Sequence, residues 1–512
     1  MEPLIVCACA FMVLIVLLRR RAGRVQCLPP GPPGRPIIGH LHLLQPPLHL
    51  CLHTLSQQYG PIFFIKMGSS PAVVVSSPFW AKEFLHTHEH DFADRPQFEA
   101  SKRIFYNNRT LVMMEYGSLW RHLRKLYTVH ILSSKRVEMF ENPRLEEMAL
   151  SIKLLENQMC GAVVDLRKLV FNTVGNMMSR MLFSKRSFDV SEAADGGECR
   201  FKELVERTAV LFGTPFLGDL VPWLSWLDVQ GARKRMDRVA KELDKFFEEV
   251  LVERIATSRG VSEEETDADY LDMLLRIYNE DGGMDRDSIK CILMDLLMAS
   301  IETTTTAIEW TLAELLNNKS CMMKLQEEVD TLIQGEDAAV LNGSGKCLVR
   351  DSQLTKLGYL QAIFKESLRL HPPFALNLRQ MCKALDTGIK VGGYDLPKKT
   401  RVIFNLWAMA RDTTMWGANA GSFCPDRFLN DGAPDLRGHH YEFLPFGTGR
   451  RGCPGMSMAL TVAPFVVANL VLRFNWETPD GIILDLSKEA SSLTAPLATP
   501  LVAIPTLRRS SQ

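Results

Sequence analysis

Near the C-terminus, one cysteine lies among glycines in the stretch Phe446-Gly447-Thr448-Gly449-Arg450-Arg451-Gly452-Cys453-Pro454-Gly455. An apolar run from Met456 to Leu472 follows directly and predicts a helix. Glycines adopt positive φ and let the backbone approach a flat ligand closely. The positive end of the following helix favours an anionic sulfur at Cys453. The stretch therefore predicts a thiolate metal ligand, and the alternative is a buried structural cysteine.

This stretch contains the complete pattern F-x-x-G-x-R-x-C-x-G, with Phe446, Gly449, Arg451, Cys453 and Gly455 at its fixed positions. Through these residues the chain resembles the cytochrome P450 family of haem-thiolate monooxygenases. The resemblance implies that haem b is the cofactor and that Cys453 is the axial ligand of its iron, to which a thiolate donates electron density. It also implies that the other four residues contact the haem, with Arg451 facing an anionic propionate.

Residues 285 to 317 form the longest predicted helix, because apolar residues recur there at helical spacing on both sides of a polar centre. The centre is Ala299-Ser300-Ile301-Glu302-Thr303-Thr304-Thr305-Thr306, where four consecutive β-branched residues weaken a helix. Their hydroxyls can bond to carbonyls four residues earlier, so a Thr-rich face satisfied by the backbone is the plain alternative. An interruption of this kind indicates a functional site.

The centre of this helix resembles the family's oxygen-activation motif, small-Gly-x-acid-Thr. Ala299 stands at the small position, Glu302 at the acid and Thr303 at the hydroxyl, while Ser300 replaces the usual Gly. The resemblance implies that Glu302 and Thr303 are catalytic and deliver protons during O₂ activation. It implies a mainly α fold with a smaller β-rich portion, in which this long central helix lies over the haem.

A further motif concerns the haem edge. The run Trp120-Arg121-His122-Leu123-Arg124-Lys125 matches the family's W-R-x-x-R-K. Trp120 and Arg124 share a helix face, and an indole N–H and a guanidinium can both donate to a propionate. Arg379 is a further candidate for this role. The alternative for the Trp120–Arg124 pair is a cation–π contact at the surface.

The spacing E-x-x-R occurs at Glu366 and Arg369, which share one helix face. By itself this spacing also fits a surface ion pair worth roughly 0–1 kcal/mol. In the family the two residues join a later arginine in a buried structural network behind the haem. Arg427 in Phe423-Cys424-Pro425-Asp426-Arg427-Phe428 is the matching residue, with Asp426 where Glu is commoner.

Composition excludes several classes of protein. The 59 basic and 59 acidic residues among 512 cancel, so no nucleic-acid partner is indicated. The 12 cysteines are scattered and contain no C-x-x-C pair, which argues against zinc and thioredoxin-like sites. Their spacing suits a reducing compartment better than a disulfide framework.

The N-terminus predicts a membrane anchor over residues 1–27. Residues 3–18 carry no charge, and Arg19, Arg20, Arg21 and Arg24 follow them. A cleaved signal peptide is the alternative, but the charges come after the apolar run and leave the rest of the chain on the cytosolic side. The Pro-rich residues 28–36 form a stiff hinge, and residues 37–512 form the haem-thiolate domain. The expected location is the endoplasmic reticulum membrane.

Weaker patterns predict several other elements. Residues 71–76 and 400–406 are predicted strands, and residues 237–255 are a helix with a buried apolar stripe. The polar residues 190–198, 258–268 and 334–346 are predicted loops. No linker divides the chain after residue 60.

The resemblance extends from about residue 28 to 505 and is greatest to the plant microsomal A-type group. It implies an enzyme that inserts one oxygen of O₂ into a C–H bond and takes electrons from NADPH through a flavoprotein reductase. Basic residues that could attract this acidic partner are Arg121, Lys125, Lys135, Arg136, Arg437 and Arg450, and the alternative is an ordinary solvated charged face.

The substrate is predicted from the segments that face it in the family. They supply Phe98, Phe212, Phe216, Ala299, Phe374, Asn377, Leu493 and Thr494. Apolar groups with a few polar ones suit a small aromatic molecule, so ring hydroxylation of a phenylpropanoid or flavonoid is expected. The alternatives are a terpenoid or fatty acyl substrate, or a haem-thiolate isomerase or dehydratase that needs no reductase. A haem sensor without turnover is disfavoured by the oxygen-activation motif.

Overall fold

The computed structural model describes residues 27–188, 200–222, 225–228, 230–257, 268–281, 285–335 and 348–508, apart from positions 384, 386 and 491. All but the last residue of the predicted anchor at 1–27 lie outside the described residues. The predicted loop at 190–198 and nearly all of those at 258–268 and 334–346 lie outside them as well.

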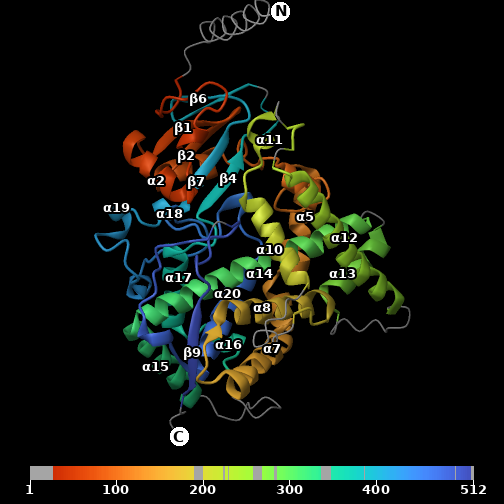
Figure 1. The fold of residues 1–512 in the computed structure, drawn as a ribbon, viewed down its shortest axis with the longest axis vertical. Coiled ribbons are helices and arrows are strands. Elements are labelled where there is room, and N and C mark those ends of the chain that lie inside the picture. The colour runs from red at the N-terminus through yellow and green to blue at the C-terminus, as the bar shows by residue number, and fades with distance from the viewer. Residues whose placement is uncertain are drawn as a thin grey trace, which may run out of the picture.

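Helices make up most of the described chain, as predicted (Figure 1). The α-helices are α2 (Leu48–Tyr59), α3 (Pro78–Lys82), α4 (Glu99–Ile104), α5 (Ser118–Lys125), α6 (Ser134–Met139), α7 (Glu141–Leu154), α8 (Leu166–Phe183), α10 (Arg200–Gly213), α11 (Leu217–Leu220), α12 (Ala232–Thr257), α13 (Tyr270–Asp281), α14 (Arg286–Asn317), α15 (Lys319–Gly335), α16 (Asp351–Leu354), α17 (Gly358–Leu370), α18 (Leu406–Met409), α19 (Thr413–Trp416) and α20 (Met456–Arg473). Shorter 3₁₀ and π turns include Leu126–Ile131, Pro425–Phe428 and Gly449–Arg451.

The smaller β portion contains three sheets. The largest has the order β1-β2-β7-β4, from β1 (Ile62–Met67), β2 (Ser70–Val75), β7 (Arg401–Asn405) and β4 (Leu376–Gln380). Only β2 and β7 in it are parallel, with Ala72 opposite Arg401. The other sheets are β3 (Val164–Asp165), β9 (Val502–Leu507) and β8 (Phe474–Glu477), and the hairpin of β5 (Ile389–Val391) and β6 (Tyr394–Leu396).

The predicted strands are confirmed to within one residue as β2 and β7. The Pro-rich hinge lies against this sheet, because Phe64 N–H in β1 donates to Pro30 O at 2.7 Å. Gly31 is required there: a Cβ would lie 2.2 Å from Phe64 O. The hinge is therefore bound to the folded domain for part of its length.

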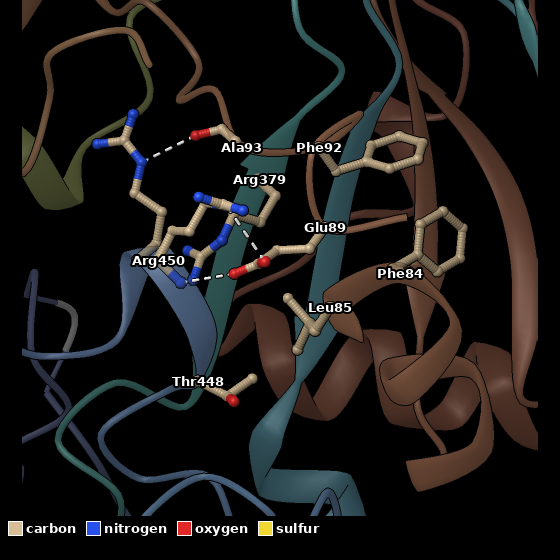
Figure 2. Close-up of a pocket in the computed structure, with 9 residues that line it drawn as sticks. Phe84, Leu85, Glu89, Phe92, Ala93, Arg379, Thr448 and Arg450 are labelled. Carbon is tan, nitrogen blue, oxygen red and sulfur yellow. Dashed lines mark hydrogen bonds and ion pairs between the residues drawn. The ribbon is translucent and has the colours of Figure 1, made fainter. Parts of the chain in front are cut away.

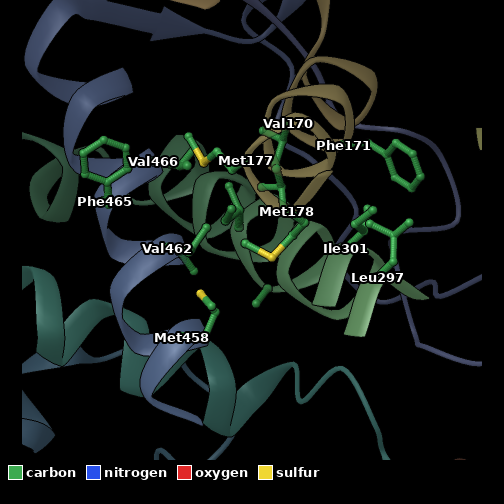
Figure 3. Packing of buried hydrophobic residues seen from close by; sticks show 14 of the residues in the cluster. Val170, Phe171, Met177, Met178, Leu297, Ile301, Met458, Val462, Phe465 and Val466 are labelled. Atoms are coloured by element: carbon green, nitrogen blue, oxygen red, sulfur yellow. The ribbon is translucent and has the colours of Figure 1, made fainter. Parts of the chain in front are cut away.

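The core is built around α14, which packs against α8, α17 and α20. Figure 3 shows side chains of α8, α14 and α20 interdigitating there, among them Met178, Leu297 and Val462. The Asp285 carboxylate accepts a 2.8 Å hydrogen bond from Ser288 N–H and caps the helix. Both α14 and α20 are long and apolar enough to cross a membrane, but they are mostly buried in this core. The helix predicted at 285–317 is thus confirmed.

The Thr-rich centre does not break α14. Thr303 Oγ1 donates to Ala299 O at 2.7 Å, and Ser300 Oγ donates to Leu296 O at 2.5 Å. This is the back-bonding that the sequence predicts for such residues. The helix at 237–255 is also confirmed within α12, where Val239, Leu243 and Leu251 are buried.

Glu366, Arg369 and Arg427 meet in a buried network, as expected from the motif. Arg369 Nε and Nη2 donate to the two Glu366 oxygens at 2.7 and 2.8 Å, and both side chains are fully buried. Arg427 Nε donates to the same carboxylate at 3.1 Å. Arg369 Nη1 also donates to Ala410 O and Ala420 O. The network therefore ties α17 to the segment between α18 and the turn at Pro425–Phe428.

We expect Arg369→Met to destabilise the protein by about 3–5 kcal/mol, because it leaves the buried Glu366 carboxylate without its bidentate partner. The matched control is Lys324→Met, since Lys324 and Asp426 form a 3.6 Å pair in which both side chains are more than half exposed. That change should cost less than about 1 kcal/mol. Urea unfolding measures both, and equal effects would show that the network does not stabilise the fold.

Candidate functional site

The loop around Cys453 closes on itself. Cys453 N–H donates to Phe446 O at 2.8 Å, which turns the chain back before α20 begins at Met456. Gly447 and Gly449 take φ values of +67° and +64°, which a side chain would strain. A Cβ on Gly449 would lie 2.3 Å from Glu89 Oε1. These two glycines thus set the path of the loop, as the sequence predicts.

Cys453 is accessible and yet surrounded by protein. Cys453 is exposed, but the surrounding protein raises the pKa of its thiol, against a backbone hydrogen bond from Gly455 and the charge of Arg124, which lower it. Desolvation of the sulfur comes from all the protein atoms around it, and not only from those that cover its surface. The sulfur therefore has room for a ligand inside a low-dielectric environment.

A second accessible point lies on the otherwise buried α14. Ala299 is exposed, although Leu297 and Ile301 on either side have no exposed surface. Thr303, one turn later, is partly exposed. The small side chain at 299 thus leaves room beside the oxygen-activation residues.

Three arginines lie together near this loop. Arg379 is buried in β4, and its Nη1 donates to Asn377 Oδ1 at 2.7 Å. Arg95 donates to the Leu378 carbonyl, and its Nε lacks a partner among the described residues. Arg451 uses its guanidinium on three carbonyls, those of Ala93, Leu111 and Met114, at 2.8, 3.2 and 2.7 Å.

These cations destabilise one another. Burial lowers the pKa of Arg95 to about 10. Burial, and then repulsion from Arg95 and Arg451, lowers the pKa of Arg379 well below its ordinary value, despite the attraction of Glu89. Burial and repulsion from Arg95 also lower the pKa of Arg451 to about 9, despite the attraction of Asp94. No carboxylate of the described residues forms an ion pair with any of the three, so the cluster is suited to hold an anionic group.

A small pocket opens beside this cluster, lined by Arg379, Arg451 and residues of the turn before α4 (Figure 2). Glu89 there accepts from Arg450 N–H at 2.6 Å and pairs with Arg450 Nε at 3.2 Å. Arg450 is predicted to attract a reductase, but in this ion pair its charge is balanced by that of Glu89. Of the other predicted basic residues, Arg121, Lys125, Lys135 and Arg437 are exposed.

The Trp120–Arg124 prediction needs a partial correction. Trp120 is buried, and its indole N–H donates to Leu111 O at 3.1 Å. An indole has a single donor, so this bond takes the one that was predicted for a propionate. Arg124 donates to Gly452 O at 2.7 Å with one N–H, and its charge acts on Cys453. Arg124 therefore remains a candidate through its other N–H groups.

Asp295 braces the segment that holds Trp120 and Arg451. Its carboxylate accepts from Leu111 N–H at 2.6 Å and from Tyr127 OH at 3.3 Å. Burial raises the pKa of Asp295 to about 7, against these hydrogen bonds, which lower it. Because the Leu111 carbonyl accepts from both Trp120 and Arg451, this contact links α14 to the arginine cluster.

Glu302 belongs to a separate hydrogen-bonded chain. Thr494 Oγ1 donates to Glu302 Oε1 at 3.2 Å, and Thr306 Oγ1 donates to Thr494 Oγ1 at 3.3 Å. Burial raises the pKa of Glu302, and the Thr494 hydrogen bond lowers it. The Thr303 hydroxyl still has its acceptor capacity after its bond to Ala299 O.

Three of the residues predicted to contact substrate, Phe212, Phe374 and Leu493, lie where three segments of the chain meet. The segment after α17 contacts the loop at 492–501, since Ala495 N–H donates to Pro373 O at 3.0 Å. The end of α10 contacts the same loop, since a Cβ on Gly213 would lie 2.8 Å from Ser492 C. These contacts bring Phe374 and Leu493, which are 39 % and 42 % exposed, close to the end of α10. Phe212 near that end stacks on Phe105 with ring centres 4.8 Å apart.

Four other residues predicted to contact substrate interact with side chains of the protein. Asn377 Oδ1 accepts a hydrogen bond from Arg379, and Thr494 Oγ1 donates one to Glu302. Phe216 is buried under Arg233, and Phe98 lies under Arg401. For Asn377 and Thr494 these hydrogen bonds fix the side chains in the protein, and their contact with substrate stays a prediction.

Sequence reasoning missed Arg95 and Asp295. Arg95 lies 284 residues before Arg379, and nothing in its spacing connects the two. Asp295 did carry a signal: an acidic residue between Met294 and Leu296 in an apolar helix is rarely buried without a partner.

A haem fits this donor set. Its iron needs only one protein thiolate, and its propionates are anions that arginines can meet. Among the described residues, no group of three His, Cys, Asp or Glu is placed to hold a metal ion. The fold and these residues therefore define a haem-thiolate protein.

Comparison with known proteins gives the family. The sequence profile of Cytochrome P450 matches residues 29–500, and the chain belongs to this family. It is a monooxygenase with haem-thiolate iron, and a reductase supplies its electrons from NADPH.

Three of its relatives are plant enzymes, in agreement with the A-type resemblance. Cytochrome P450 750A1 of Pinus taeda is 37 % identical over 99 % of this chain and 96 % of its own length. Psoralen synthase of Ammi majus is 38 % identical over 96 % of both chains. Strychnine-11-hydroxylase of Strychnos nux-vomica is 36 % identical over 97 % of this chain and 94 % of its own.

We expect Arg379→Met to have opposite effects on the haem-free and haem-loaded protein. Without an anion, removing one of three repelling cations stabilises the fold by about 1–4 kcal/mol. With haem, losing a charged hydrogen-bond donor lowers haem affinity roughly ten- to a hundredfold. Thermal unfolding and haem titration measure the two effects. The control Arg437→Met removes an exposed cation and should change neither, while destabilisation of both forms by Arg379→Met would contradict the role of the cluster.

Proposed function

We infer that Cys453 holds the iron of haem b and that the chain hydroxylates the ring of a small phenylpropanoid or flavonoid. Support for the ligand comes from the accessible sulfur in its glycine loop and from the uncompensated arginines beside it. The uncompensated charge is the observation that carries most weight, because a buried cation cluster is unstable without an anion. Arg95, Arg379 and Arg451 would hold the propionates, and Arg124 would lie beside the sulfur.

When bound, the haem supplies the activation of O₂ with two electrons from NADPH. Inserting one oxygen into a C–H bond and releasing the other as water consumes two protons. Thr303 faces the accessible part of α14 and can pass a proton through its hydroxyl. Burial raises the pKa of Glu302, so this carboxyl can take up and release protons closer to neutral pH than a solvated one.

Aromatic side chains support the proposed substrate class. Phe212 and Phe374 lie where α10, the segment after α17 and the loop at 492–501 (the C-terminal loop) meet. Aromatic walls favour planar ligands. One relative is named for making psoralen and another for hydroxylating strychnine, so enzymes at this level of identity differ in substrate. A terpenoid or fatty acyl molecule is the second candidate.

We also propose that the enzyme lies on the endoplasmic reticulum membrane, held by the anchor at residues 1–27 and facing the cytosol. Ser69 N–H donates to Leu220 O at 2.9 Å, so the loop of α11 lies against the β1–β2 turn near the start of the described chain (Figure 1). Large exposed apolar side chains occur in these two regions: Ile37, Ile38, Leu217, Trp226 and Leu227. Such a patch suits a lipid surface.

Product analysis by mass spectrometry tests the proposed reaction. Microsomes containing the full-length protein and a plant reductase are given NADPH with a panel of phenolics, flavonoids, terpenes and fatty acids. We expect a gain of one oxygen on phenolics or flavonoids alone, with no product in the absence of NADPH.

Cys453→Ala is the matched control and should give no product, because it lacks the thiolate. A gain on terpenes or fatty acids alone would refute the aromatic substrate. Conversion of a peroxide without NADPH, and no oxygenated product with it, would favour the isomerase or dehydratase.

A further inference from the structure

The C-terminal loop is fixed to α14 at several points. Trp310 Nε1 donates to Ala495 O at 2.8 Å, and Leu501 N–H donates to Glu309 Oε1 at 3.0 Å. Arg167 of α8 bonds Glu309 at 2.7 Å and also reaches the Leu497 carbonyl. Thr494 at the start of this loop is therefore held at a defined place against the helix.

The Thr494 hydroxyl accepts one hydrogen bond and donates another. Its Oγ1 is buried and has a single hydrogen. Because Thr306 donates to it at 3.3 Å, that hydrogen is free to donate to Glu302 Oε1 at 3.2 Å. The chain Thr306–Thr494–Glu302 thus ends on the carboxylate, where an ionised oxygen is the better acceptor.

No cation of the described residues forms an ion pair with Glu302. Among the described residues, Thr494 is the one side chain that donates a hydrogen bond to it. Arg167 attracts it from α8 but is bonded to Glu309, while Glu206 of α10 and Glu309 of α14 repel it. Burial raises the pKa of Glu302, and the Thr494 bond is the largest influence that opposes this rise.

We propose that Thr494 is the positioning residue of the proton supply, which orients the Glu302 carboxylate and favours its ionised form. Thr494 follows Leu493, which is 42 % exposed near the end of α10. A substrate in contact with Leu493 therefore lies one residue from the group that positions the acid. This links the presence of substrate to proton delivery, and it rests on the proposed role of Glu302.

The experiment compares Thr494→Val with Thr494→Ser in the full-length, haem-loaded protein. Valine keeps the shape of threonine and removes the hydroxyl, whereas serine restores it. With reductase and a turned-over substrate, Thr494→Val should lower product per NADPH roughly tenfold, the scale of a lost hydrogen bond to a charged group. Thr494→Ser should restore it. Thr305→Val is the control, because the buried Thr305 hydroxyl has no partner among the described residues.

A second readout does not depend on turnover. Infrared spectroscopy follows the Glu302 carboxyl band with pH in the substrate-free protein, with Glu302→Gln to assign it. In Thr494→Val the protonation midpoint should move to higher pH, because the bond that lowers the pKa is gone. Thr494→Ser and Thr305→Val should keep the wild-type midpoint.

The outcomes separate this inference from the proposed function. If Glu302→Gln reduces coupling while Thr494→Val changes neither coupling nor the carboxyl titration, the positioning role is overturned and the proton role of Glu302 stands. If Glu302→Gln leaves coupling unchanged, the proton role of Glu302 fails, and the positioning role fails with it.

Discussion

Burial of three arginines that form no ion pair with a described carboxylate is the constraint on which the rest of this structure depends. Arg95, Arg379 and Arg451 come from three distant parts of the chain and meet in a low-dielectric region. Their repulsion makes the folded protein costly until an anion joins them. The neighbouring glycine loop presents Cys453 at an accessible place, so one ligand with a metal centre and an anionic edge satisfies both features. The backbone carbonyls around Arg451 hold it ready for that ligand.

The long helix α14 connects this region to the chemistry. Most of its length is apolar core, but it also carries five acidic residues, of which Asp295 and Glu302 each hydrogen-bond a different neighbour. Asp295 supports the Leu111 segment, on which Trp120 and Arg451 depend. Glu302, two turns later, bonds the C-terminal loop through Thr494. A single helix therefore sets the position of the haem edge at one point and of the proton supply at another.

Several elements and motifs of this structure could be predicted from the sequence, but the partners of several individual polar side chains could not. The helix at α14, the strands β2 and β7 and the glycine loop followed from local spacing, because those features are encoded within a few residues. The Glu366–Arg369–Arg427 network followed from the family motifs, since Arg427 lies 61 positions after Glu366. The partner of the Trp120 indole and the roles of Asn377 and Thr494 did not follow. The Trp120 and Thr494 hydrogen bonds join residues nine and 192 positions apart. Asn377 and Arg379 are only two positions apart, but a polar side chain near a pocket can bind either the ligand or the protein. Arg95 was missed because it lies 284 residues before Arg379.

The claim tested most directly is that Cys453 supplies the thiolate to the haem iron. The decisive measurement is the absorption difference spectrum of the reduced, carbon monoxide-treated full-length protein, recorded for wild type, Cys453→Ala and Cys453→His. The account predicts a band at the thiolate position in wild type, its loss in Cys453→Ala, and a shift to the imidazole position if Cys453→His retains haem. A thiolate band that persists in Cys453→Ala would contradict the account, because another cysteine would then hold the iron.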